Sequence, residues 1–195
     1  MQYKLYASMQ RSDEQLFRLM KNGDTSHTRQ GAFAELYERR EPGLYRYAMH
    51  MTGSAAAAEE IAHDVFIQIM SATCRFDDER GALEGWMYGV ARNLVRALRR
   101  KGPVEEPVDQ AVHHNILGDL IDGQTMASLH AAIRELPEAY RETVVLCDLE
   151  ERNYDEAARM MGCPVGTVRS RLHRARALLA GKLRRLKPME LVATS

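Results

Sequence analysis

The segment Pro164–Pro188 contains the side chains of this sequence that are best suited to ionic contacts with nucleic acid. The segment contains eight Lys or Arg and no Asp or Glu. Lysine and arginine neutralise phosphates, and an arginine can also read the edge of a guanine with two hydrogen bonds. A solvated basic helix is the ordinary alternative for a run of charge. The local pattern favours DNA binding over that alternative.

Two helices and a tight turn are predicted to position these side chains. Asn153 is a suitable N-cap, and Glu156 follows three residues later, as in a capping box. Gly162 ends this first helix, and Pro164 suits the first turn of the next one. Such a pair is typical of a helix-turn-helix, whose second helix enters the DNA major groove.

The second helix divides into two faces when its residues are placed about 100° apart. The face predicted to be buried is apolar and consists of Val165, Val168, Leu172, Ala175 and Leu179. The opposite face carries small, hydrogen-bonding or cationic side chains, namely Gly166, Arg169, Ser170, His173, Arg174 and Ala177. Small residues let a helix approach DNA closely, and the polar ones can contact bases and phosphates. Arg171 and Arg176 lie nearer the apolar stripe, which favours phosphate contact or a structural role.

The composition restricts the class of protein. The chain has 195 residues and a net charge of zero, so its basic segments are balanced by acidic ones elsewhere. It has no signal peptide and no apolar run long enough to cross a membrane. Three widely spaced cysteines without a CxxC pair are typical of reduced cytoplasmic thiols. We therefore expect a cytoplasmic protein without membrane insertion.

Nothing in the sequence predicts an active site. There is no glycine-rich phosphate loop after a strand and no pairing of a nucleophile with a base. His113 and His114 are adjacent, but no third ligand lies at metal spacing. We expect no enzyme activity, no small-molecule substrate, no cofactor and no metal site.

The apolar periodicity predicts an all-α protein of two small helical domains with almost no strand signal. The first domain is expected at 1–101, with helices at 12–20, from about 31 to 52, at 54–74 and at 84–101. A polar stretch, 24–30, precedes the second helix, and Pro42 should kink or divide it. A linker is expected at 102–124, with a short helical turn at 115–121. The second domain, 125–195, contains helices at 125–135 and 137–149 before the helix-turn-helix.

Two helices of the first domain carry candidate binding faces. Glu60, Asp64 and Gln68 recur at i, i+4 and i+8, which indicates either a solvated face or a docking surface for a basic partner. The helix at 84–101 ends in five cations without an intervening acid: Arg92, Arg96, Arg99, Arg100 and Lys101. Trp86 and Tyr88 lie just upstream, and aromatic rings beside cations suit single-stranded nucleic acid. A core position for Trp86 is the favoured alternative.

Three segments together resemble a known family. AEEIAHDVFIQIM (Ala58–Met70) and GWMYGVARNLVRALRRK (Gly85–Lys101) are similar to sigma domain two. The segment Leu136–Leu179, which includes CPVGTVRSRLHRAR, is similar to sigma domain four. The chain thus resembles an extracytoplasmic-function (ECF) RNA polymerase sigma factor of the sigma-70 family.

The resemblance implies specific roles and partners. Core RNA polymerase would be bound through its β′ clamp helices and β flap, with Glu60, Asp64 and Gln68 on the clamp. Residues implied in contacts to the −10 element are Asp78, Arg80, Trp86, Asn93 and Arg96. Those implied at the −35 element are Gly166, Thr167, Arg169, Ser170, Arg171, His173 and Arg174. Promoter DNA and an anti-sigma factor are the remaining implied partners.

Two other classes of protein remain open from the sequence. A helix-turn-helix regulator acting without polymerase would explain 153–177 but would leave 58–101 without a role. An adaptor that binds a regulator through its helical faces would bind no DNA at all.

Overall fold

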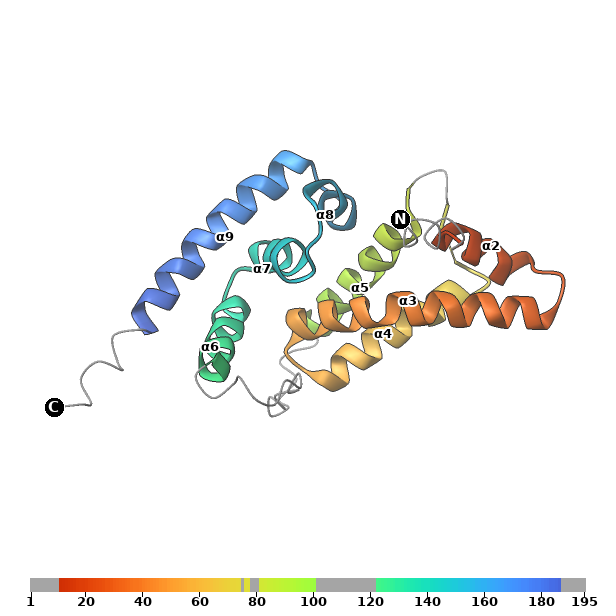
Figure 1. Ribbon diagram of the computed structural model, residues 1–195, viewed down its shortest axis with the longest axis horizontal. Coiled ribbons are helices and arrows are strands. Elements are labelled where there is room, and N and C mark those ends of the chain that lie inside the picture. The colour runs from red at the N-terminus through yellow and green to blue at the C-terminus, as the bar shows by residue number, and fades with distance from the viewer. Residues whose placement is uncertain (1–10, 75, 78–80, 101–121, 187–195) are drawn as a thin grey trace, which may run out of the picture.

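A computed structural model describes residues 11–74, 76–77, 81–100 and 122–186, and all of its regular elements are helical, as predicted. Figure 1 shows two lobes side by side. The N-terminal lobe consists of α2 (Asp13–Asn22), α3 (Ser26–Thr52), α4 (Ala55–Met70) and α5 (Leu83–Arg100). The C-terminal lobe consists of α6 (Asp122–Arg134), α7 (Glu138–Val144), the π-helix η1 (Val145–Leu149), α8 (Tyr154–Met161) and α9 (Val165–Leu186).

In the N-terminal lobe, α3 is the central element and packs against α2, α4 and α5. Its core includes the fully buried Leu36, Val65, Phe66 and Met87. Tyr88 and Val95 of α5 are also buried, although the helical periodicity predicted neither in the core. Tyr88 fits because Gly43 leaves room for it: a Cβ at Gly43 would lie only 2.9 Å from the Tyr88 hydroxyl.

In the C-terminal lobe, α9 packs along α6, α7 and α8. Its buried side chains are Val168, Leu172, Ala175 and Leu179, while Val165 is half-buried. The apolar stripe predicted for this helix is therefore confirmed. Helix α9 continues for several turns beyond the turn that joins it to α8. Its exposed side chains therefore form one continuous surface.

The cap predicted at Asn153 and the helix end predicted at Gly162 are confirmed, and Ser12 and Ser54 cap two further helices. Ser12 and Asn153 each form a capping box with the side chain three residues later. Ser54 caps α4 by accepting a hydrogen bond from the Ala57 amide. Gly162 ends α8 with φ of 61°, a left-handed conformation that glycine adopts at little cost.

The structure differs from the predicted helices at three points. Pro42 lies inside a continuous α3, which is not divided at that point. Burial of Leu36 and Leu44 on either side of the proline offsets the loss of one backbone hydrogen bond. The expected helix at 137–149 instead changes from α-helix to π-helix at Val145, and α3 begins at Ser26, within the stretch expected to be polar coil.

Removal of the α8 cap should lower stability. Asn153→Ala deletes the acceptor for the Glu156 amide, 2.9 Å away, so we expect the free energy of unfolding to fall by about 1 kcal/mol. Urea denaturation measures the change. Asn22→Ala, at an exposed position in the last turn of α2, is the control and should change stability by less than about 0.5 kcal/mol.

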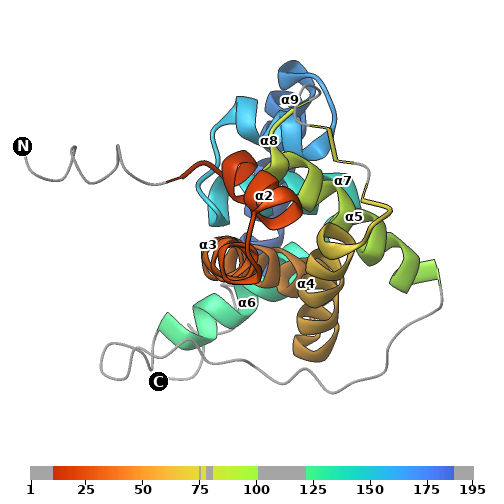
Figure 2. The same ribbon diagram turned by 90° about the vertical axis from the view of Figure 1, so that its right-hand side faces the viewer.

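The two lobes are in direct contact. Helix α5 packs on α8, and α3 contacts α6, α7 and η1. Figure 2, in which the molecule is turned by 90° about the vertical axis, also shows α8 beside α5. Gly85 lies against the α8 backbone, where an added Cβ would be 3.8 Å from the Arg159 carbonyl carbon. None of the helices in the described ranges is long and apolar enough to cross a membrane.

Candidate nucleic-acid and polymerase interface

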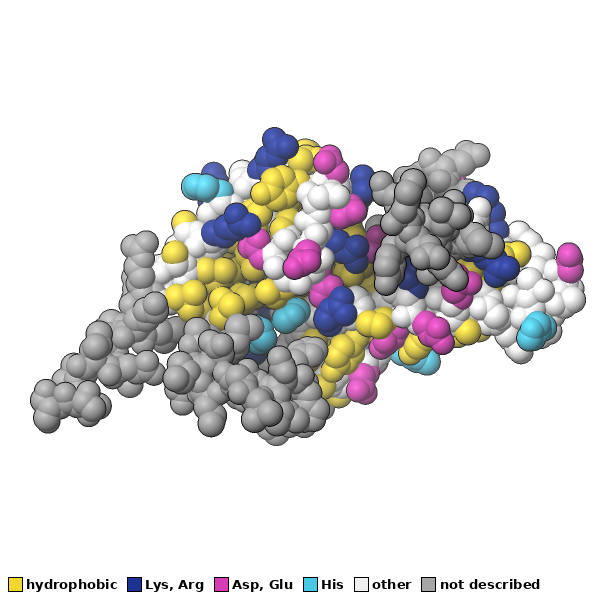
Figure 3. All heavy atoms as spheres, viewed as in Figure 1, with side chains coloured by type: hydrophobic (Ala, Val, Ile, Leu, Met, Phe, Trp, Pro, Cys, Tyr) yellow, Lys and Arg dark blue, Asp and Glu magenta, His cyan; other side chains and the backbone are white. Residues whose placement is uncertain are grey.

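The outer face of α9 is the first candidate interface. Gly166, Arg169, Ser170, His173 and Arg174 are all exposed, on the side opposite the buried stripe. Thr167 is half-buried, and its carbonyl accepts a hydrogen bond from the Ser170 hydroxyl at 3.0 Å. On the face seen in Figure 3, basic side chains and a histidine lie over the upper part of α9. This surface can donate hydrogen bonds and neutralise phosphates along one groove.

Arginines on the flanks of this face are partly engaged within the lobe. Arg176 forms two hydrogen bonds to Asp148, at 2.6 and 3.2 Å, which raise the pKa of its guanidinium. The half-buried Arg171 lies 4.0 Å from the Cys163 sulfur. Arg169 lies over the ring of Tyr154, 5.7 Å from its centroid. Arg174 has no such restraint within the described residues, so it and Arg169 are the cations best placed to reach DNA.

Helix α4 carries the second candidate interface. Glu60 and Gln68 are exposed, and Asp64 is partly exposed between them. Ile67 is 52% exposed beside Asp64 and Gln68, and Met70 is 61% exposed at the end of the helix. An exposed apolar side chain next to acidic ones is suited to a basic protein partner. We call Glu60, Asp64, Ile67 and Gln68 the acidic face.

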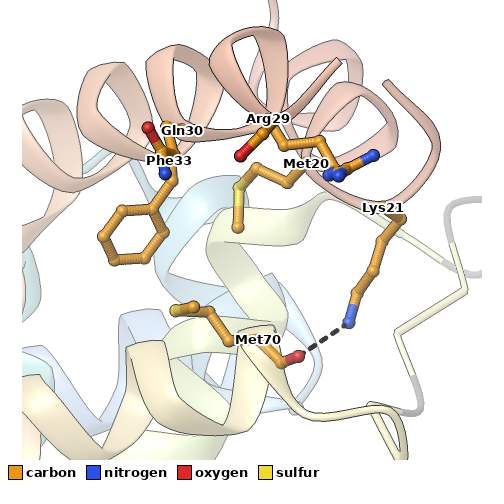
Figure 4. Close-up of a pocket in the computed structure, with 7 residues that line it drawn as sticks. Met20, Lys21, Arg29, Gln30, Phe33 and Met70 are labelled. Atoms are coloured by element: carbon orange, nitrogen blue, oxygen red, sulfur yellow. Dashed lines mark hydrogen bonds between the residues drawn. The ribbon is translucent and has the colours of Figure 1, made fainter. Parts of the chain in front are cut away.

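A hollow lies at the end of α4. It is lined by side chains of α2, α3 and α4, with Met20, Phe33 and Met70 forming its apolar part (Figure 4). Lys21 bridges the helices on one side by donating hydrogen bonds to the carbonyls of Ser71, at 2.8 Å, and Met70, at 3.4 Å. Met70 therefore belongs both to this hollow and to the end of the exposed side of α4.

Helix α5 carries the third candidate interface, and its residues differ in accessibility. Asn93 is exposed. Trp86 is half-buried, packs against the core and lies edge-on to Phe76, with ring centroids 6.1 Å apart. Arg96 is exposed but pairs with Glu138 of α7 at 2.8 Å. Asp78 and Arg80 lie outside the described residues.

The sequence did not predict the acidic partners of α5. Glu138 binds Arg96 and Arg99, and Glu142 binds Arg92 at 2.6 Å, so three of the five cations at the end of this helix face carboxylates. The hydrogen bond from Arg96 lowers the pKa of Glu138. Glu142 is 3% exposed, and a glutamate that is nearly buried needs a charged or hydrogen-bonding partner. Nothing in the sequence around Glu142, which lies on α7, indicated that its partner would come from the other lobe.

No cluster of metal-binding side chains occurs among the residues whose placement is described. His113 and His114 lie outside them. All three cysteines are free thiols, in line with the sequence. Burial, with a smaller contribution from Asp148, raises the pKa of the Cys147 thiol to about 11.

Cys147 should therefore be a poor nucleophile. Only the thiolate reacts, and a pKa of about 11 in place of 9.0 lowers the thiolate fraction at pH 8 by about 100-fold. We expect alkylation by iodoacetamide at Cys147 to be slower by about that factor in the folded chain than in urea, and to increase with pH up to about 11. Mass spectrometry of timed samples measures both rates. Equal rates in the two states would contradict the predicted protection.

These features define a two-lobed, all-helical protein with a C-terminal helix-turn-helix and an acidic face on α4. Residues 36–103 match sigma-70 region 2, and residues 126–179 match sigma-70 region 4. The chain belongs to the ECF sigma factors of the sigma-70 family. It is a transcription initiation factor that binds core RNA polymerase and promoter DNA.

Individual relatives support this placement. The ECF RNA polymerase sigma factor RpoE of Cereibacter sphaeroides is 31% identical over 153 residues, which cover 76% of this chain and 84% of the relative. The ECF RNA polymerase sigma factor SigE of Mycolicibacterium smegmatis is 31% identical over 160 residues, 74% of this chain and 59% of the relative. A solved structure of CnrH with the cytosolic domain of CnrY has the same fold: the TM-score is 0.66 at 23% identity, over 89% of this chain and 97% of that one.

Proposed function

We propose that this sigma factor reads the −35 element with the outer face of α9 and the −10 element with α5 and the segment before it. The observation that carries the first assignment is the separation of faces on α9, where the side chains able to read bases are exposed and the apolar ones are buried. At the −35 element the contacting residues would be Gly166, Thr167, Arg169, Ser170, Arg171, His173 and Arg174. At the −10 element they would be Asp78, Arg80, Trp86, Asn93 and Arg96.

Polymerase docking is assigned to the acidic face of α4. Glu60, Asp64 and Gln68 would contact the β′ clamp helices, and the C-terminal lobe would contact the β flap. The apolar Ile67 is well placed to anchor this contact, because desolvated apolar groups at the centre of an interface contribute most of its free energy. The factor would act in the cytoplasm, where its polymerase is, and would have no enzymatic activity of its own.

An anti-sigma factor is proposed as a regulator. The sigma factor RpoE of Bartonella quintana, solved in complex with the anti-sigma factor NepR, shares this fold with a TM-score of 0.61 at 24% identity. The proposed division of the chain is polymerase binding and −10 recognition by 1–101, a linker at 102–124, and −35 recognition by 125–195.

Reconstituted transcription tests the proposed function. Purified protein, core RNA polymerase and a pooled promoter library would be combined, and the transcript 5′ ends sequenced. Starts that share a two-part upstream motif, and that are absent with core polymerase alone, are the expected result. No added starts from folded protein and active core enzyme would contradict it. A stable homodimer on a palindromic site would instead support a regulator that acts without polymerase.

A further inference from the structure

An aromatic ring of α8 lies against one arginine of the outer face of α9. The Cζ atom of Arg169 lies over the ring of Tyr154, 5.7 Å from its centroid, which is within the range of a cation–π contact. Tyr154 is 37% exposed, and Arg169 is exposed as well. In the described part of the chain the Arg169 guanidinium makes no hydrogen bond or ion pair, so this ring is its partner there. The contact therefore lies at the surface, at the edge of the face assigned to the −35 element.

The local structure around Tyr154 fixes the place of its ring. Tyr154 is the first residue of α8 and directly follows the N-cap Asn153. The capping box between Asn153 and Glu156 holds the backbone there with hydrogen bonds of 2.9 and 3.1 Å. Helix α8 packs against α9 beyond the turn at Gly162. The ring is thus carried by a capped helix that is packed on α9, and not by a loop.

Arg169 needs a partner of this kind more than Arg174 does. With residues about 100° apart on the helix, Arg174 lies about 40° from Ser170, which is at the centre of the outer face. Arg169 lies about 100° from Ser170, on the flank from which Tyr154 approaches. A long side chain on this flank has many rotamers that do not reach the groove, and their loss on binding costs free energy. A ring that restricts those rotamers before DNA binds reduces this cost.

The kind of contact leaves Arg169 able to bind DNA. Arg176, on the same helix, is held by the Asp148 carboxylate through hydrogen bonds of 2.6 and 3.2 Å, which occupy its donors and balance its charge. The face of a tyrosine ring carries no net charge and attracts the cation through its quadrupole. The Arg169 guanidinium therefore keeps its charge and its N–H donors, which are the groups that pair with a guanine edge. Tyr154 can hold Arg169 without competing with DNA for it.

We propose that Tyr154 is a positioning residue for −35 recognition. Its ring holds the Arg169 guanidinium ready to contact a base, and so contributes to affinity and sequence preference without reading a base itself. This inference rests on the proposed function, because it assumes that the outer face of α9 reads the −35 element.

Tyr154→Ala in the full-length protein tests the proposal. Fluorescence anisotropy would measure binding to a −35 duplex found by the transcription assay and to a duplex of altered −35 sequence. We expect binding to the −35 duplex to weaken by about 2- to 5-fold, the factor that corresponds to a cation–π contact at an exposed site. The loss should be smaller with the altered duplex, so the preference for the −35 sequence falls. In the Arg169→Ala background, Tyr154→Ala should cause no further loss, because the side chain that it positions is already absent.

Three matched variants separate positioning from other roles of Tyr154. Tyr154→Phe keeps the ring and should bind both duplexes as the wild type does. Tyr154→Leu keeps apolar bulk without an aromatic face and should resemble Tyr154→Ala. Arg174→Ala should add its effect to that of Tyr154→Ala, since Arg174 lies on the other flank of the helix. Circular dichroism and urea denaturation verify the folding of each variant.

Four results would overturn the proposal. The first is unchanged affinity and preference in folded Tyr154→Ala. The second is an equal loss in the wild-type and Arg169→Ala backgrounds, which would show that the two side chains are not coupled. The third is a loss in Tyr154→Phe as large as in Tyr154→Ala, which would assign the effect to a contact of the hydroxyl with a phosphate. The fourth is wild-type binding by Tyr154→Leu, which would show that apolar bulk suffices.

Failure of the proposed function is recognised separately. In that case Arg169→Ala and Arg174→Ala would both keep the sequence preference of the wild type. If Arg169→Ala reduces this preference and Tyr154→Ala does not, only the role of Tyr154 is wrong.

Discussion

Arg169→Ala and Arg174→Ala are each expected to weaken binding to the −35 element by about 1–3 kcal/mol, or roughly 5- to 150-fold, if each side chain makes a bidentate contact with a base. Both arginines are exposed on α9 opposite its buried stripe. Their removal leaves Val168 and Leu172 in place, so stability should change little. Fluorescence anisotropy with a −35 duplex and with a duplex of altered sequence measures affinity and specificity together.

The control for this prediction is Arg176→Ala on the same helix. Arg176 is held by Asp148 and lies nearer the apolar stripe, so it can reach at most a phosphate. Its loss should weaken binding to both duplexes by a similar small factor and lower the salt dependence. A base-reading arginine should instead reduce the preference for the −35 sequence. If Arg169→Ala and Arg174→Ala leave promoter preference unchanged, the outer face of α9 is not the reading surface.

The local elements could be predicted from the sequence because short-range rules determine them. Asn153, Gly162 and Pro164 specify where α8 ends and α9 begins, and each rule concerns residues only a few positions apart. The stripe of α9 follows from the period of 3.6 residues. The side chains exposed on the opposite face of α9 could be predicted for the same reason.

Contacts between the lobes could not be predicted in this way. Glu142 and Arg92 are 50 residues apart, and nothing in the periodicity of either helix indicates their pairing. Tyr88 and Val95 were missed in the core because α5 is covered by α3 and α4 on one side and by α8 on another, which widens its buried surface beyond a single stripe. Pro42 was expected to kink or divide α3, but the helix continues through it, and burial of the residues around it outweighs the local effect of the proline.

The same distinction explains why the acidic partners at the basic end of α5 could not be predicted. A run of cations without acids in sequence indicates a cationic surface, but electrostatics acts through space. Glu138, Arg96 and Arg99 form one cluster in the fold although they come from opposite lobes. The acidic and basic segments that balance the net charge of this chain therefore do so partly by pairing with each other.

Charge reversal on the acidic face should separate polymerase binding from DNA binding. Asp64→Lys is expected to weaken binding to core RNA polymerase by about 10-fold or more, since like charges placed opposite each other in an interface cost several times the thermal energy. Asp64 is partly exposed and lies one helical turn before the exposed Ile67, so the charge change falls next to the apolar residue of the face. Biolayer interferometry with immobilised core enzyme measures the affinity.

Glu38→Lys provides the matched control, because Glu38 is an exposed acid on α3 outside the acidic face and its reversal changes the net charge equally. If net charge alone governed association, both variants would lose affinity to the same extent. We expect Glu38→Lys to bind core enzyme nearly as the wild type does, and both variants to bind a −35 duplex normally. Parallel loss of polymerase and DNA binding by Asp64→Lys would indicate unfolding and would remove the support for α4 as the docking helix.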